Sequence, residues 1–108
     1  MNILMALSQL EITGAEVYAT TIADELIKRG NKVYIVSDTL TTPTKAEYIK
    51  LEFNKRSLGK RIEHIKFLCK LIKEKDIQIV HAHSRASSWS CQVACKLAGI
   101  PLITTTHG

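Results

Sequence analysis

Short apolar runs alternate with longer amphipathic stretches along this chain of 108 residues. Five of the short runs are rich in β-branched residues or alternate apolar with polar positions, which is typical of strands. They cover residues 2–7, 32–37, 48–53, 77–83 and 100–106. We expect residues 48–53 to form a half-buried edge strand and residues 100–103 to lie in a buried strand.

Three of the intervening stretches have the apolar period of amphipathic helices. They cover residues 15–29, 56–75 and 86–98. The period predicts which side chains face inward: Ala15, Ala19, Ala23 and Ile27 beside Ile22 and Leu26 in the first helix, Ile62, Ile65, Leu68, Cys69 and Ile72 in the second, and Trp89, Val93 and Leu97 in the third.

The ends of two helices carry recognisable signals. Thr13 and Glu16 have the spacing of a capping box at the start of the first helix, which explains Glu16 without any ligand. Gly30 follows that helix and predicts a left-handed cap, because glycine adopts this conformation without steric cost. Gly99 ends the third helix in the same way.

Strands that alternate with helices predict an α/β fold, here a Rossmann-like, doubly wound parallel sheet with helices on both faces. The length allows one domain, over residues 1–108. In such a sheet the first and fourth strands are neighbours, and the strand order reverses between them. A ligand crevice opens at the carboxyl edge of the sheet at this point.

The charge is distributed unevenly. The net charge is +5, and residues 45–76 hold ten of the 15 Lys and Arg residues but five of the ten Asp and Glu residues. Such a patch attracts anionic lipid headgroups, phosphates or nucleic acid, or is a solvated helix face. No apolar run is long enough to span a bilayer. The apolar start lacks the basic lead-in of a signal peptide, and three cysteines fit a reducing cytoplasm.

Gly14 is the one glycine in the loop before the first helix. The dinucleotide-binding fingerprint needs three glycines, and no P-loop sequence is present, so a nicotinamide or flavin site is poorly supported. Asp38, after the second strand, is therefore interpreted as a turn residue. Because Gly14 has no side chain, the backbone N–H groups at this helix N-terminus are open to a ligand. They either bind an anion such as phosphate, or the glycine only forms a tight turn.

Two histidines follow predicted strands at the edge where ligands bind. His83 follows the fourth strand and His107 follows the last. A neutral imidazole there either donates a hydrogen bond to a sugar hydroxyl or a phosphate, or makes structural hydrogen bonds. Arg85 adds a positive group beside His83.

His81 and His83 lie two residues apart, and therefore on the same side of their strand. Together with Cys91 and Cys95 they suggest a zinc site. However, the chain has no C-x-x-C motif, and two cysteines four apart on an amphipathic helix are more often core residues. We expect no metal site.

Three blocks of sequence carry a family resemblance. They are Thr13-Gly14-Ala15-Glu16, the run from Val80 to Arg85 (Val-His-Ala-His-Ser-Arg), and the final ten residues, ending in Thr-Thr-Thr-His-Gly. Their order and spacing resemble the N-terminal half of the family 4 retaining glycosyltransferases, which have the GT-B architecture. The first block resembles the G-G-x-E loop of that family, with Thr13 in place of the first glycine.

The resemblance implies transfer of a hexose from a nucleotide sugar to a lipid-linked or saccharide-linked acceptor with retention, without a metal or other cofactor. It implies that His107 is catalytic and lies near the donor sugar. It implies that Gly14 lies near the donor phosphates. Glu16, His83 and Arg85 would face the acceptor, which could be a lipid or a lipopolysaccharide core.

A GT-B enzyme also has a second Rossmann-like domain, which binds the nucleotide sugar. We expect residues 1–108 to form only a partial N-terminal domain, truncated or split, with no second domain and no activity alone. A second polypeptide would complete it. We further expect a cytoplasmic location, with basic residues 56–73 at the anionic inner face of the membrane, and no nucleic-acid partner. A stand-alone binding module or a non-functional remnant remains the alternative.

Overall fold

The computed structural model describes residues 1–7, 14–37, 40, 43–51, 58–83 and 85–104, with the backbone alone at 14–16, 58–61 and 85–88. Strands and helices follow one another in the predicted order, including the two consecutive strands β2 and β3. The elements are β1 (Asn2–Ala6), α1 (Gly14–Lys28), β2 (Lys32–Ser37), β3 (Glu47–Lys50), α2 (Leu58–Glu74), β4 (Ile79–Ala82), α3 (Arg85–Ala98) and β5 (Leu102–Thr104).

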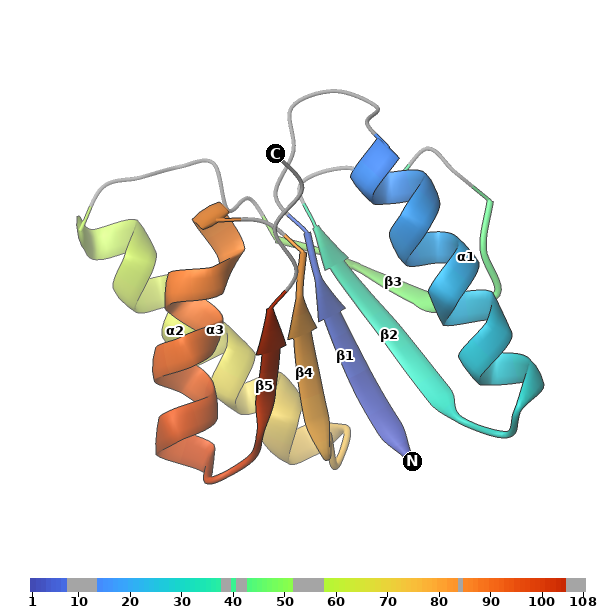
Figure 1. The fold of residues 1–108 in the computed structure, drawn as a ribbon. Helices are drawn as coiled ribbons and strands as arrows, with labels where there is room; N and C mark the ends of the chain where they lie inside the picture. The colour runs from blue at the N-terminus through green and yellow to red at the C-terminus, as the bar shows by residue number, and fades with distance from the viewer. Residues whose placement is uncertain (8–13, 38–39, 41–42, 52–57, 84, 105–108) are drawn as a thin grey trace.

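All pairs of neighbouring strands are parallel, in the order β3-β2-β1-β4-β5. The chain builds outward from β1 in one direction through β2 and β3, and then returns to pair β4 with the other side of β1 (Figure 1). Met5 accordingly has Ile35 as its partner on one side and His81 on the other. The predicted doubly wound sheet is confirmed, with its reversal of strand order between β1 and β4.

Helices cover both faces of the sheet. α1 lies on one face, and α2 and α3 lie side by side on the other (Figure 1). Side chains alternate between these faces along each strand, so Leu4 and Ala6 enter the core under α2 and α3, whereas Met5 enters the core under α1. Complete burial of a side chain such as Leu4 or Met5 contributes about 1.5–3 kcal/mol.

The predicted inward stripe of α1 is confirmed where side chains are described. Ala19 and Ala23 are fully buried, and Ile22, Leu26 and Ile27 pack around them. The small alanines let this helix lie close to β1 and β2.

Gly30 follows the end of α1 and has the predicted left-handed backbone conformation, with φ +95°. The Gly30 N–H donates to the Ile27 carbonyl at 3.0 Å, and the Asn31 N–H donates to the Leu26 carbonyl at 3.0 Å. These two bonds satisfy carbonyls of the last helical turn. Gly99 has φ +73° after α3 and plays the same part.

The prediction for the buried face of α2 is partly wrong. Leu68 and Ile72 are buried, but Ile62 is 47% exposed, while His64 and Leu71 are buried instead. The helix packs against α3 and shares a core with the strands, so its buried surface is wider than a single stripe, and this surface does not include Ile62.

The face of α3 that was predicted to be buried is the wrong one. Trp89 is 47% exposed and Leu97 is 71% exposed. The buried side is instead made by small residues, namely Ser90, Cys91, Ala94 and Cys95. Small side chains allow α3 to approach both α2 and the sheet closely, and this contact outweighs the larger apolar area of the Trp89 stripe.

The two edge strands differ in how well they were predicted. β3 pairs only with β2 and is an edge strand, as expected, although it is shorter than predicted and mostly exposed. β5 is the other edge, where Ile103 is 49% exposed. The prediction of a buried last strand is therefore wrong, because α1 covers β1 and β2 and does not extend over β5.

Within the described residues, no helix is long and apolar enough to cross a membrane.

Candidate functional site

The carboxyl edge of the sheet brings together the start of α1, the end of β4 and the start of α3. The backbones of Gly14 and Glu16 lie in the first turn of α1, and Arg85 is the first residue of α3. His83 follows the last residue of β4. Four predicted site residues thus lie on segments that meet at this edge (Figure 1).

His83 is held at the point where the strand order reverses. Its backbone N–H donates to the Ala6 carbonyl at 2.8 Å, which continues the pairing of β4 with β1 one residue beyond the strand. The side chain is 1% exposed. The imidazole is therefore enclosed and not open to solvent, although the residue follows the strand at the predicted edge.

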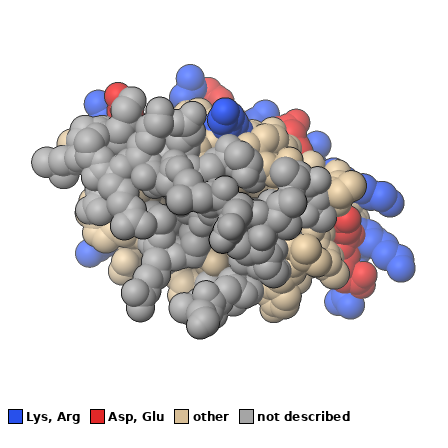
Figure 2. All heavy atoms as spheres, turned by 90° about the horizontal axis from the view of Figure 1, so that it is seen from above, with Lys and Arg blue, Asp and Glu red and all other residues tan. Residues whose placement is uncertain are grey.

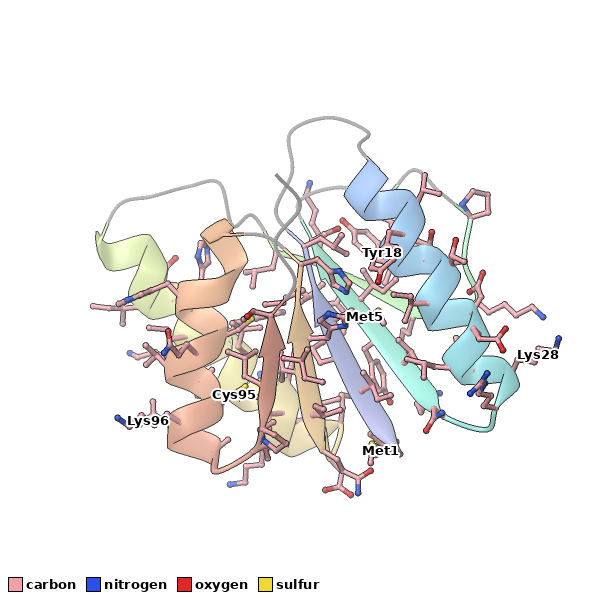
Figure 3. The ribbon with its side chains drawn as sticks, in the orientation of Figure 1. Met1, Met5, Tyr18, Lys28, Cys95 and Lys96 are labelled. Carbon is pink, nitrogen blue, oxygen red and sulfur yellow. The ribbon has the colours of Figure 1, made fainter. Side chains whose placement is uncertain are left out.

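Two aromatic rings fix the position of the His83 imidazole. The His81 ring lies 3.9 Å from it between centroids, tilted by 37°. The Tyr18 ring lies 6.2 Å away at an interplanar angle of 69°, an edge-to-face contact. The expectation that His81 and His83 share one side of their strand is confirmed, and this is the side covered by α1. In Figure 3, Tyr18 reaches from α1 toward the ends of the central strands.

Tyr18 was missed by the sequence analysis. It lies one helical turn after Gly14, and a helix that begins at a ligand edge places its first two turns near that edge. This spacing was the signal available in the sequence.

The zinc interpretation fails because the sheet separates its members. Cys91 and Cys95 lie in the core under α2 and α3, whereas His81 and His83 lie on the α1 side. The prediction that both cysteines are core residues is confirmed. Burial raises the pKa of Cys95 to about 11, with a further contribution from Cys69, and it raises the pKa of Cys91 further still. Within the described part of the chain, no three His, Cys, Asp or Glu residues are grouped to hold a metal ion.

Several predicted positions fall outside the described residues. They include Thr13, Asp38 and the proposed catalytic residue His107. The backbones of Glu16 and Arg85 are described, but their side chains are not. Their roles therefore stay predictions.

One hollow lies away from this edge. It has a volume of about 450 Å³ and lies between α2 and α3, lined by Cys69, Ile72, Lys73, Leu97 and Ala98. None of these residues belongs to the predicted site.

The fold is shared with several glycosyltransferases of known structure. A glycosyltransferase from Rickettsia africae aligns with 95% of this chain at 24% identity and a TM-score of 0.82. WaaB, a lipopolysaccharide outer core galactosyltransferase, aligns with 99% at 16% identity and a TM-score of 0.77. MurG from Acinetobacter baumannii aligns with 98% at 16% identity and a TM-score of 0.74. At these identities the likeness shows a common fold.

The aligned region covers 28%, 33% and 35% of these three proteins, so the chain spans about a third of their length. No curated protein sequence matches the chain. The sequence model of Glycosyltransferase Family 4, however, matches residues 12–108, which is nearly the whole chain. The chain therefore belongs to Glycosyltransferase Family 4.

Proposed function

We propose that this chain is the acceptor-side part of a glycosyltransferase that moves a hexose from a nucleotide sugar to a lipid-linked or saccharide-linked hydroxyl, with retention. The main support is the position of His83 in a family 4 chain, next to the point where the strand order reverses. One neighbour of similar fold supports the substrate class by name, the lipopolysaccharide outer core galactosyltransferase WaaB.

The start of α1 suits the donor side of such a site. Gly14 is the first residue of this helix, where backbone N–H groups and the helix dipole favour a diphosphate. We assign the acceptor side to Glu16, His83 and Arg85. The His83 ring is enclosed and both of its nitrogens are buried, so we propose that this fixed ring supports the surface on which the acceptor lies and that Glu16 and Arg85 make the polar contacts. His107 is proposed to act next to the donor sugar.

We place the machinery that holds the rest of the donor outside these 108 residues, in the part of a GT-B enzyme that they do not span. The share of the neighbours that the chain spans, about a third, supports this division. The 108 residues alone are then expected to transfer no sugar.

We also propose a cytoplasmic location at the inner face of the membrane. Lys66, Lys70 and Lys73 are exposed and lie on one face of α2, four and three residues apart. Viewed from above the carboxyl edge, Lys and Arg side chains project at the periphery of the molecule, with Asp and Glu side chains beside some of them (Figure 2). A row of cations of this kind is attracted to anionic headgroups.

The test is a transfer assay with the 108-residue chain, nucleotide hexoses and a lipopolysaccharide-core acceptor, with and without a separately expressed GT-B C-terminal domain. We expect product only when both polypeptides are present, with the anomeric configuration of the donor retained. Rapid transfer by the chain alone would contradict the proposal that these 108 residues lack part of the donor site. Sugar binding without any transfer in the mixture would instead favour a stand-alone binding module.

A further inference from the structure

Tyr18 combines exposure with contact to a proposed acceptor residue. It is 48% exposed, and its neighbour Val17 is 50% exposed, so the second turn of α1 presents apolar surface to solvent. The same tyrosine ring meets the enclosed His83 ring edge to face. Its ring therefore lies between solvent and the enclosed imidazole of His83.

The Tyr18 ring is held in place before any ligand arrives. On one side it contacts His83, which is itself packed against His81. The backbone beneath it is helical and is anchored by the fully buried Ala19. An aromatic side chain with two rotatable bonds loses little entropy on binding when its position is already fixed.

The surroundings of this ring fit a sugar better than a lipid chain. A pyranose has an apolar face of C–H groups, which stacks on an aromatic ring, and a rim of hydroxyls. Thr21 lies three residues after Tyr18 on the same face of α1, and its exposed hydroxyl oxygen can accept a hydrogen bond from such a rim. A hydrocarbon chain would cover this hydroxyl without offering it a hydrogen bond, which is unfavourable.

We propose that Tyr18 determines acceptor specificity by stacking on a pyranose ring of the acceptor, next to His83. This inference rests on the proposed function, because it takes the acceptor to lie at the edge of the sheet next to His83. It selects the saccharide portion of the acceptor, and not its lipid, as the part recognised at this position.

The experiment is an NMR titration of the full 108-residue chain with a panel of methyl hexopyranosides and, separately, a short-chain alkyl phosphate. In the wild-type chain we expect shifts of the Tyr18 ring and His83 ring signals with pyranosides. Tyr18→Phe should change the dissociation constant by no more than about twofold, and Tyr18→Leu should weaken binding about two- to tenfold, since an aromatic contact is lost. Leucine keeps the apolar bulk but removes the aromatic face.

Leu97→Ala is the matched control, because it removes an exposed apolar side chain from the far end of α3 and should leave binding unchanged. Circular dichroism establishes that each variant is folded. Equal binding by wild type and Tyr18→Leu would overturn stacking, and so would ring shifts with the alkyl phosphate but not with pyranosides.

The transfer assay separates this inference from the proposed function. Transfer by the two-polypeptide mixture with an unchanged acceptor KM in Tyr18→Leu would overturn the role of Tyr18 and leave the function standing. Pyranoside binding that depends on Tyr18, without transfer, would support the stacking site and count against the transferase.

Discussion

The imidazole rings of His81 and His83 pack against each other with their centroids 3.9 Å apart, on the face of β4 that α1 covers. The two residues differ in environment, since His83 is enclosed and His81 is only partly buried. The pair lies where β4 leaves β1, so it links the packing of the sheet to the proposed acceptor site.

Removing the enclosed ring should cost more stability than removing its partner. His83→Ala is expected to lower the free energy of unfolding by about 1–3 kcal/mol, because it leaves a cavity under α1 and removes the contact with Tyr18. His81→Ala should cost less, since solvent can fill part of its space. Urea denaturation followed by circular dichroism measures both, and a larger cost for His81 would contradict this packing.

Gly30 should be replaceable only at a conformational cost. Its φ is +95°, and a Cβ at this position would meet no atom within 4 Å, so any penalty comes from the backbone and not from a clash. Gly30→Ala is expected to lower the free energy of unfolding by about 1–2 kcal/mol. Gly30→Asn should cost less, because asparagine tolerates left-handed backbone better. Equal effects of the two substitutions on the urea midpoint would argue against a backbone origin.

The thiols of α3 should be nearly inert in the folded chain. Burial raises the pKa of Cys95 to about 11, and it raises the pKa of Cys91 further. At pH 8 a disulfide reagent should therefore modify the half-buried Cys69 well before either of them. Urea unfolding should bring all three to similar rates. Fast modification of Cys91 in the absence of urea would contradict the enclosed core.

The same shift has a defined sign for stability. Above the ordinary thiol value of 9.0, the unfolded chain loses thiol protons that the folded chain keeps. The free energy of unfolding should consequently fall as the pH rises from 9 toward 11. Cys95→Ser is the comparison, since a hydroxyl does not titrate in this range and the variant should show a shallower decline.

Asp24 ties α1 to the segment that leads into β3. The Thr44 hydroxyl donates to Asp24 Oδ1 at 2.6 Å, and the Lys45 N–H donates to the same oxygen at 2.9 Å. The Thr44 bond, followed by the Lys45 N–H, lowers the pKa of Asp24 from 3.8. The stabilisation is present above that ordinary value and is lost as the pH falls through the lowered pKa.

Thr44→Val should therefore lower the free energy of unfolding at pH 7 by about 0.5–1.5 kcal/mol, toward the lower end because the site is only partly buried. Asp24→Asn keeps an acceptor oxygen but cannot ionise, so its stability should vary less between pH 5 and pH 3. Thermal melts across this range test both expectations. An Asn variant with an unchanged acid transition would show that Asp24 does not contribute to it.

Charge reversal on α2 tests the proposed membrane surface. Lys66→Glu, Lys70→Glu and Lys73→Glu together should abolish sedimentation with vesicles rich in anionic phospholipid, and binding of the wild type should weaken with added salt. The control is the triple reversal of Lys28, Arg29 and Lys32, which changes the net charge equally at the far end of α1. If both triple variants lose binding to the same extent, the attraction is one of net charge and not of α2.

Much of the fold could be predicted from local patterns. The strand at residues 32–37 matches its predicted bounds, and the left-handed conformation at Gly30 follows from the lack of a side chain. Within the site, the start of α1 was predicted one residue late, at residue 15 and not Gly14, and the shared face of His81 and His83 was predicted correctly, because helix starts and strand alternation are local.

Other features required knowledge of what each element packs against. Trp89 and Leu97 form the larger apolar stripe of α3, yet the smaller stripe of Cys91, Ala94 and Cys95 is buried. The burial of His83 and its contact with Tyr18 likewise depend on how α1 crosses the sheet. No local pattern encodes the distance between two residues that lie 65 positions apart.

Local signals in the chain were enough to specify the alternation of strands and helices, the positions where helices end and the family. These follow from backbone sterics, apolar periodicity and short motifs, which act over a few residues. The three-dimensional packing was needed to establish which side of α3 faces the core, that the cysteines and histidines lie on opposite faces of the sheet, and that Tyr18 meets His83. Those outcomes depend on close contact between distant segments, where shape and volume select the side chains that fit together.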